Sequence, residues 1–174
     1  IAMNAGYGFF TSAAAALGAS AVVGFINGAL IAWLRIPPFV VTLGMLSIAR
    51  SIAMVLSDNR MIFEFGPDED LLFEVGGGST YGIAHPVIAL VVLGLVTSLV
   101  LRWTRWGTHV FAIGANERAA VLTGINVPLV KISVYVFSSL IAGLTGILEA
   151  GWLGGVTTNL GQSMELTVIA ATVI

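Results

Sequence analysis

Cysteine and charged side chains are what this sequence lacks. It contains no cysteine, so disulfide bonds and metal sites built on thiolates are excluded. Only 9% of its 174 residues are charged, whereas soluble domains carry about 25%. Hydrophobic residues make up 57% of the chain, and the mean hydropathy is +1.01. Because a soluble domain of this size cannot bury that much apolar surface, the sequence predicts an integral membrane protein.

Signals for the start and the end of a chain are also missing. The sequence has no initiator methionine and no basic segment typical of a signal peptide. Its last residues, 167–174, lie within an apolar run without a helix-stop signal. We therefore expect an internal piece of a longer protein, a single transmembrane domain over residues 1–174 that is truncated at both ends.

Long apolar runs predict the membrane-spanning helices. A span needs about 20 apolar residues, and residues 1–34 contain no charged side chain. Pro37 and Pro38 end the first run, because proline cannot continue a helix, and they can open the next one. We predict an all-α membrane protein, a polytopic transmembrane helix bundle with about five spans. The spans are expected at residues 10–34, 39–56, 86–103, 132–153 and 164–174.

The charges between the runs predict the topology. Residues 57–85 contain six acids and one base, Arg60. Residues 102–131 contain four bases and one acid, Glu117. Since lysine and arginine concentrate in cytoplasmic loops, we expect the acidic loop outside and the basic loop, 104–131, inside.

Two rows of small residues, each spaced four apart, predict where spans pack. The rows are Ser12, Ala16, Ser20, Gly24, Gly28 and Ala32, and then Ala142, Gly146, Ala150 and Gly154. Small residues let membrane helices approach closely. The helix-packing positions expected from these rows are Gly24, Gly28, Gly146 and Ala150. A chain rich in alanine and glycine also produces such rows by chance, and that alternative stays open.

A short helix is predicted inside the loop 104–131. Asn116 is a good N-cap, Glu117 suits the positive end of a helix, and Gly124 is a natural stop. The helix would cover residues 117–123, a length of roughly 10 Å. A helix this short is not stable alone in water. It is either a docking element for a cytosolic partner or an amphipathic helix that lies on lipid.

Few residues offer catalytic or metal-binding chemistry. The histidines His85 and His109 lie on opposite predicted faces, and no catalytic triad or His-x-x-x-His pair occurs. The acids at 68–70 lack the ligand spacing of a calcium loop. The sequence therefore predicts neither an enzyme nor a metal site. The basic residues flank loops, which explains them without nucleic-acid binding.

Several sequence blocks, taken together, resemble one family of transporters. The blocks lie at residues 27–31, 36–45, 49–50, 104–107, 112–120, 123–125, 131–146, 164–166 and 169–171. They include Asn-Gly-Ala-Leu-Ile at 27–31, Ile-Pro-Pro-Phe-Val at 36–40 and Thr-Arg-Trp-Gly at 104–107. The combination resembles the permease subunits of ribose-type ABC importers, which carry monosaccharides.

The resemblance implies a permease of about ten spans, each of about 20 residues, that works as a dimer of permease chains in a bacterial inner membrane. A periplasmic sugar-binding protein would deliver the sugar, and a cytosolic ABC ATPase would drive transport. The permease would then be no enzyme and hold no cofactor, since ATP binds to the ATPase. The loop helix would be the coupling helix, and its movement would tilt the spans at 86–103 and 132–153. The coupling residues would be Gly114, Ala115, Asn116, Glu117, Arg118, Ala119, Ala120, Leu122, Gly124 and Ile125.

The expected sugar path combines weakly polar residues with the proline break. Its candidates are Asn27, Pro37, Pro38, Phe39 and Thr42. Each of them can also be an ordinary interhelical or lipid contact. The roles of three charged residues within or next to predicted spans stay open, namely those of Arg50, Glu149 and Glu165.

The sequence departs from the family pattern in three places, and the substrate stays open. The glycine-rich block that usually follows is missing, Thr167 stands where an acid is common, and the loop 57–85 is unusually acidic. Relatives in the same superfamily carry branched-chain amino acids, urea or a signalling furanose. A more distant alternative is an ion-coupled secondary transporter, which usually places acids or histidines inside its spans.

Overall fold

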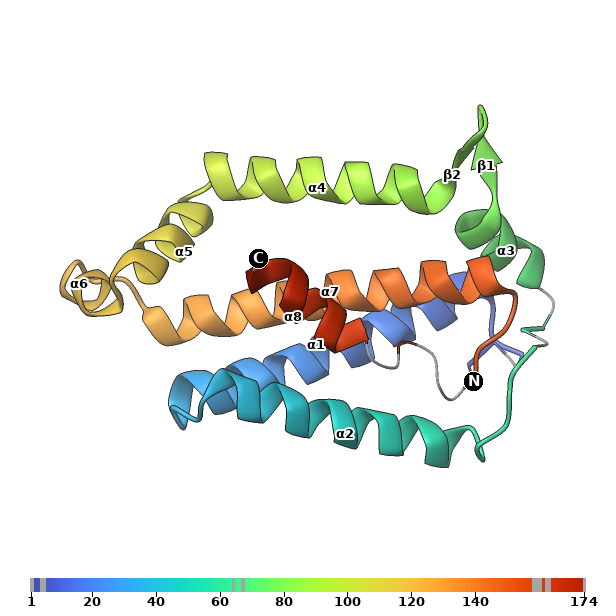
Figure 1. Ribbon diagram of the computed structural model, residues 1–174, viewed down its shortest axis with the longest axis horizontal. Helices are drawn as coiled ribbons and strands as arrows, with labels where there is room; N and C mark the ends of the chain where they lie inside the picture. Colours follow the sequence, from blue (N-terminus) through green and yellow to red (C-terminus); the bar gives the residue numbers. More distant parts are fainter. Residues whose placement is uncertain are drawn as a thin grey trace.

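The chain folds into helices and one small β-hairpin (Figure 1). The computed structural model describes residues 2–3, 6–63, 65–66, 68–157, 161 and 164–173. In chain order the elements are α1 (Phe9–Trp33), α2 (Pro38–Leu56), α3 (Glu69–Gly77), β1 (Ser79–Thr80), β2 (Ile83–Ala84), α4 (His85–Trp103), α5 (Arg105–Ala115), α6 (Glu117–Leu122), α7 (Val127–Leu153) and α8 (Met164–Val173).

Four of the described helices, α1, α2, α4 and α7, are long and apolar enough to cross a membrane. The prediction of an all-α membrane protein is therefore confirmed. The helices coincide closely with the predicted spans, except that α7 begins at Val127 rather than at residue 132. α8 has 10 residues, which is a length of about 15 Å, so the described part of the fifth predicted span is shorter than a bilayer.

Signals outside the apolar run explain the early start of α7. The side chain of Asn126 caps the helix by accepting a hydrogen bond from the amide of Leu129 at 3.3 Å. Pro128 follows in the first turn, where its missing N–H costs nothing. The apolar pattern predicts a start beyond Lys131, because it detects only the part of a helix that lies at membrane depth.

Helix α5 is not predicted by the sequence pattern, and it occupies the part of the predicted loop 104–131 that precedes the short helix. Thr104 is extended, with φ −111° and ψ 154°, and this residue separates α5 from α4. Its hydroxyl oxygen caps α5 by accepting from the amide of Gly107 at 3.2 Å. A Cβ at Gly107 would collide with the carbonyl of Leu101, so the tight passage from α4 to α5 requires glycine here.

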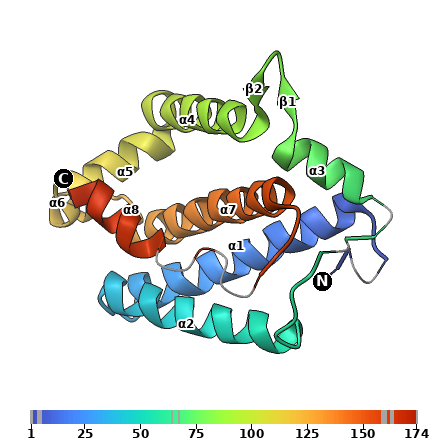
Figure 2. The same cartoon turned by 45° about the vertical axis from the view of Figure 1, so that its right-hand side comes forward.

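Helices α1 and α7 lie side by side, α2 runs along the same pair, and α4 stands apart from it (Figures 1 and 2). At one end α4 joins α5, and at the other end it contacts α3 and β2. No residue of α4 is buried. Within the described residues, the packed centre of the bundle is therefore the α1–α7 pair.

Glycines bring α1 and α7 into close contact. A Cβ at Gly24 would lie 2.7 Å from the carbonyl oxygen of Tyr135, and one at Gly28 would lie 2.7 Å from the Cα of Ile132. Both glycines are buried. The first predicted row of small residues thus contains two positions where the backbones of α1 and α7 approach too closely for any side chain.

The second predicted row plays a different part in the structure. A Cβ at Gly146 would meet nothing within 4 Å, and Gly146 and Ala150 instead line a cavity. The close approaches on α7 lie nearby in the sequence, at Gly143 against Ser20 and at Gly151 against α3. Spacing alone does not distinguish these neighbouring glycines, because they lie on adjacent faces of α7.

Helix α3 packs across the end of α7. A Cβ at Gly76 would lie 2.6 Å from the Cα of Gly151, so this crossing also depends on glycine. Leu72 on the buried face of α3 joins Met3 and Phe65 in a small apolar core. The acidic segment is thus fastened to the bundle, and is not a free loop.

A tight hairpin connects α3 with α4. Tyr81 and Gly82 both have left-handed backbone conformations, with φ +53° and +80°, as expected for a two-residue turn between paired strands. The ring of His85 lies 2.8 Å from Thr80 Oγ1 through Nε2 and 2.5 Å from the carbonyl oxygen of Glu74 through Nδ1. His85 therefore ties the hairpin and α3 to the start of α4.

Candidate functional site

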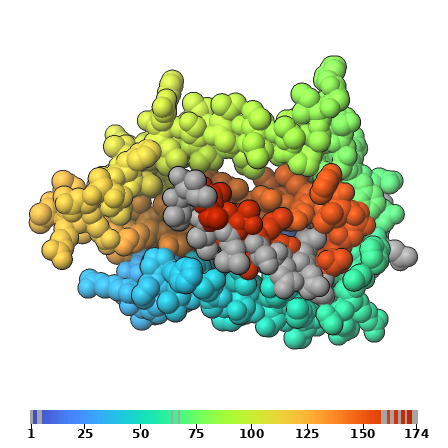
Figure 3. All heavy atoms as spheres, in the orientation of Figure 1, coloured from blue at the N-terminus to red at the C-terminus, as the bar shows by residue number. Residues whose placement is uncertain are grey.

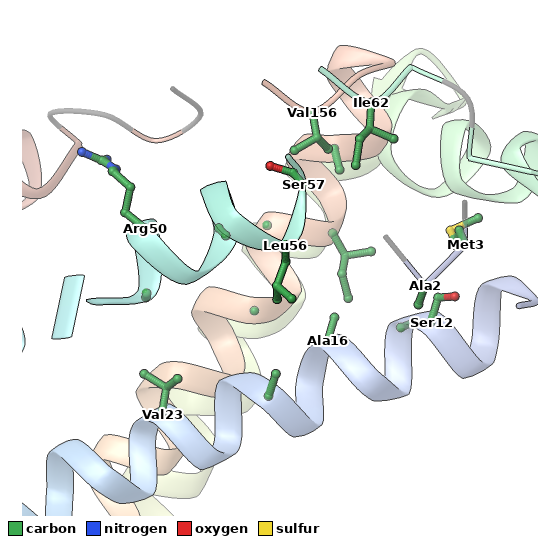
Figure 4. A pocket seen from close by; sticks show the side chains of 18 of the residues that line it. Ala2, Met3, Ser12, Ala16, Val23, Arg50, Leu56, Ser57, Ile62 and Val156 are labelled. Carbon is green, nitrogen blue, oxygen red and sulfur yellow. The ribbon is translucent and has the colours of Figure 1, made fainter. Parts of the chain in front are cut away.

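A cavity of about 980 Å³ lies between α1, α2 and α7 (Figure 4). One wall is a stripe of mostly small residues on α1, namely Ser12, Ala13, Ala16, Ala19, Val23 and Asn27. Figure 4 shows that Ser12, Ala16 and Val23 project from the same side of α1. The cavity forms here because the stripe faces α2 and α7 without side chains large enough to fill the space.

The other walls are also largely apolar. α2 contributes Met45, Leu46 and Ala53, and α7 contributes Gly143, Gly146, Ile147 and Ala150. The end near α3 is lined by the apolar core of Met3, Phe65 and Leu72. No acidic residue is among the described residues that line the cavity.

Figure 3 shows α8 crossing the face of the molecule between α2 and α4.

Two of the five residues expected on the sugar path line this cavity. Asn27 is only 8% exposed, and its Oδ1 has no hydrogen-bond partner among the described residues. Thr42 faces the cavity from α2, and its hydroxyl donates to backbone carbonyls of Pro38 and Phe39 at 3.1 and 3.2 Å. Pro37, Pro38 and Phe39 are exposed residues outside the lining.

The charged residues of the spans do not pair with one another in the described structure. Arg50 and Arg60 belong to the cavity lining, and Figure 4 shows the Arg50 side chain pointing away from α1. The described residues hold one ion pair, between Glu117 and Lys131, and it involves neither Glu149 nor Glu165.

The short helix predicted in the basic loop is confirmed as α6. Asn116 has extended backbone angles, φ −157° and ψ 101°, and its Oδ1 accepts from the amide of Ala119 at 3.1 Å. Gly124 follows with φ +83°, a conformation that favours glycine. The helix ends at Leu122, one residue before the predicted end.

The two sides of α6 differ in their exposure. Ala120 is 3% exposed and packs inward, whereas Leu122 is 89% exposed. Ala119 is exposed as well. Ala119 and Ala120 therefore do not form one smooth surface, because successive helical residues are about 100° apart around the axis. The outward surface consists of Arg118, Ala119, Val121 and Leu122.

The remaining coupling candidates surround α6. Gly114 and Ala115 are exposed at the end of α5. Ile125 is partly buried, and its amide donates to the carbonyl of Ala120 at 3.2 Å. This bond turns the chain from α6 back toward α7.

Two side-chain contacts fasten α5 and α6 to α7. Lys131 Nζ lies 2.8 Å from both carboxylate oxygens of Glu117. Trp106 Nε1 donates to Ser133 Oγ at 2.7 Å, and its ring contacts that of Phe137 with centroids 5.7 Å apart. From the sequence, Trp106 has the position of a membrane-interface residue. Its partners are 27 and 31 residues away, so no local pattern could reveal them.

The whole chain, residues 1–174, matches the family described as branched-chain amino acid transport system / permease component. The chain belongs to this family of membrane permeases. No solved structure matches it.

Curated relatives in this permease family are sugar permeases, which confirms the resemblance. The chain is 37% identical to the L-arabinose ABC transporter permease protein AraH of Azospirillum brasilense, over 90% of this chain and 45% of the relative. It is 36% identical to the fructose import permease protein FrcC of Rhizobium meliloti, over 97% and 49%. It is 35% identical to the ribose import permease protein RbsC of Escherichia coli K12, over 92% and 50%. The chain spans about half the length of these relatives.

Proposed function

We propose that this chain is the part of a monosaccharide ABC importer permease that connects the solute path with the ATPase-docking helix. The observation that supports this most directly is the double role of α7. Its second half lines the cavity, while Lys131 and Ser133 in its first half hold α6 and α5. A displacement of α6 is thereby passed to a wall of the cavity.

The packing suggests which helices move together. α7 is interlocked with α1 through Gly24 and Gly28, and interlocked helices shift as rigid bodies. An ATPase that pulls on α6 would therefore tilt α7 and α1 together against α2, and the cavity between them would change its access. The resemblance implies that movement of the coupling helix tilts the spans at 86–103 and 132–153, and in the described structure the second of these spans, α7, packs mainly against α1.

Two of the proposed partners would meet opposite ends of the bundle. The exposed side chains of Val121 and Leu122 on α6 would enter a groove of a cytosolic ABC ATPase. That ATPase binds the ATP, so the permease itself needs no cofactor and is no enzyme. The end that carries α3 would face outward and receive the sugar-binding protein. A second permease chain, identical or not, would complete the assembly in the bacterial inner membrane.

Reconstitution tests this function. The full-length permease, its ATPase and its binding protein are placed in proteoliposomes, and uptake of labelled L-arabinose, D-fructose and D-ribose is measured with and without ATP. We expect ATP-dependent uptake of at least one monosaccharide. Uptake driven by an ion gradient without ATP would overturn the proposal in favour of a secondary transporter. The lack of acids in the described lining argues against that mechanism.

The same assay decides the substrate class. The matching family is described by branched-chain amino acid transport, so labelled leucine belongs in the panel together with urea and a signalling furanose. ATP-dependent uptake of one of these, with no monosaccharide transported, would keep the importer assignment and replace the sugar.

A docking experiment tests the coupling helix separately. The sequence has no cysteine of its own, so Leu122→Cys provides a single defined thiol in this segment. We expect it to form a cross-link with the ATPase. The matched control is Leu95→Cys, which is also exposed but lies in the middle of α4. Equal cross-linking of both variants would contradict the docking role of α6.

A further inference from the structure

We infer that the backbone bridge between Ile62 and Val156 is the outer gate of the cavity between α1, α2 and α7. The inference rests on the proposed function, in which the end that carries α3 faces outward. The amide of Ile62 donates to the carbonyl oxygen of Val156 at 3.1 Å, and the amide of Val156 donates to the carbonyl oxygen of Ile62 at 2.9 Å. Two segments far apart in the chain are thus joined by a reciprocal pair of hydrogen bonds.

The bridge ties together two helices that the proposed movement would separate. Ile62 follows the outer end of α2, and Val156 follows the outer end of α7. Asn59 and Gly154 have left-handed backbone angles, with φ +54° and +63°, so each segment turns sharply just beyond its helix. A tilt of α7 against α2 therefore acts directly on the bridge.

The side chains of the bridge close the α3 end of the cavity. Ile62 and Val156 both line the cavity, and Figure 4 shows them next to each other. Both pack against the apolar core of Met3, Phe65 and Leu72, which lines the same end. A solute that arrives from the α3 end meets these five side chains before it reaches the small-residue wall of α1.

The bridge is small enough to open during transport. In the described part of the chain it is the one backbone bridge outside β1 and β2, so no neighbouring strand supports it. Water replaces backbone hydrogen bonds that open, which keeps their net cost low. The ring of Phe63 lies across Gly155, where a Cβ would come within 2.7 Å of Phe63 Cδ1. Phe63 is 60% exposed, so this cover has room to move aside.

A reversible cross-link tests the gate. Ile62→Cys and Val156→Cys are introduced together into the full-length permease, free of other cysteines. Residues that exchange both hydrogen bonds in an antiparallel pair have Cα atoms about 5.5 Å apart, which a disulfide can join. The permease, its ATPase and its binding protein are placed in proteoliposomes, and uptake is measured for whichever labelled solute the unsubstituted importer transports.

We expect uptake by this variant to depend on the state of the disulfide. Oxidation should lower it about tenfold or more, because a gate that is held covalently cannot open to admit the solute. Reduction with dithiothreitol should restore it, and the recovered uptake shows that the variant is correctly assembled.

Ser79→Cys with Ala84→Cys is the matched control. These two residues also form an antiparallel pair at the α3 end, in the hairpin of β1 and β2. Both are exposed, and neither lines the cavity. We expect their disulfide to leave uptake unchanged, which excludes an effect of the oxidant or of a cross-link at this end as such.

A second pair keeps the inference testable if the reduced Ile62 and Val156 variant is inactive. Met61→Cys with Thr157→Cys lies one position further in the same antiparallel register and leaves both residues of the bridge in place. The same loss of uptake on oxidation, and the same recovery on reduction, are expected.

Loosening the bridge should have the opposite effect on access to the cavity. Gly155→Val displaces Phe63, and Ala16→Cys on the α1 wall serves as the reporter thiol. We expect a membrane-impermeant maleimide, added from the outer side, to label this thiol faster. Gly18→Val is the control, since a Cβ at Gly18 meets nothing within 4 Å.

Three results would overturn the inference. Undiminished uptake with a complete disulfide would make the bridge a permanent tie that moves with both helices. Failure of both cysteine pairs to cross-link would show that the bridge is not formed in the whole permease. Equal labelling of Ala16→Cys with and without Gly155→Val would show that the bridge does not control access. None of these results changes uptake by the unsubstituted importer, so a failure of the gate is distinct from a failure of the proposed function.

Discussion

The contact of α1 with α7 allows a quantitative prediction for Gly28→Ala. The added Cβ would lie 2.7 Å from the Cα of Ile132 and 3.2 Å from its carbonyl oxygen. An ordinary carbon–carbon contact is about 3.5–4.0 Å. Both neighbours are backbone atoms, so no side-chain rotation can relieve the clash, and the two helices must separate by about 1 Å.

The cost of this separation can be isolated with a control on the same helix. Gly18→Ala adds the same methyl group to α1, but at a position where it meets nothing within 4 Å. Both changes gain about 0.5–1 kcal/mol from the conformational restriction of the unfolded chain. Overpacking costs about 1–3 kcal/mol. We therefore expect Gly28→Ala to be about 1–3 kcal/mol less stable than Gly18→Ala.

Unfolding of the purified full-length permease checks this value. Both variants are titrated with denaturant in the same detergent, and their free energies of unfolding are compared. A lower melting temperature for Gly28→Ala should accompany the difference. Equal stability of the two variants would refute the reasoning. It would mean that α1 and α7 lie farther apart in the whole permease than the 2.7 Å approach at Gly28 implies.

Three further predictions concern the ends of the bundle. Asn116→Ala removes the cap of α6 at a cost of about 1 kcal/mol, so we expect the affinity for the ATPase, measured by titration, to fall about fivefold. The control Asn126→Ala removes the cap of the long helix α7 and should leave this affinity unchanged. Gly76→Ala should push α3 off α7 and increase protease cleavage after α3 residues; an unchanged cleavage pattern would contradict the close crossing. Glu117→Lys should lower transport per ATP hydrolysed, and adding Lys131→Glu should restore it; no restoration would mean that the ion pair does not transmit movement.

The long helices were largely predictable from the sequence, whereas the structure of the loop 104–131 was predicted only in part. Apolar runs and the proline pair located α1, α2 and α4 within a residue or two, because membrane-depth segments must be apolar along their length. The start of α7 and the whole of α5 were not found. Both depend on capping by Asn126 and Thr104, and such short polar signals are weak beside a long hydrophobic pattern.

Two of the five residues expected on the sugar path line the cavity and three do not, and the path itself stays a prediction. Asn27 and Thr42 were expected on the path from their polarity within apolar spans, and both line the cavity. The nearby residues Pro37 and Phe39 do not, since they belong to the exposed start of α2. Which residues face a cavity depends on the rotation of each helix against its neighbours, and a nearly uniform apolar sequence does not encode that rotation locally.

The sequence by itself determined the membrane character, the positions of the long helices, the capped helix α6 and the permease family. These follow from composition, hydrophobic length and local capping, which act within one segment of chain. Only the tertiary structure decided that α7 pairs with α1, that Gly143 and Gly151 rather than Gly146 make the close contacts, and that Lys131 and Ser133 hold the loop. These contacts join residues far apart in the chain, and whether a glycine is needed at a crossing depends on how closely the two helices are placed together.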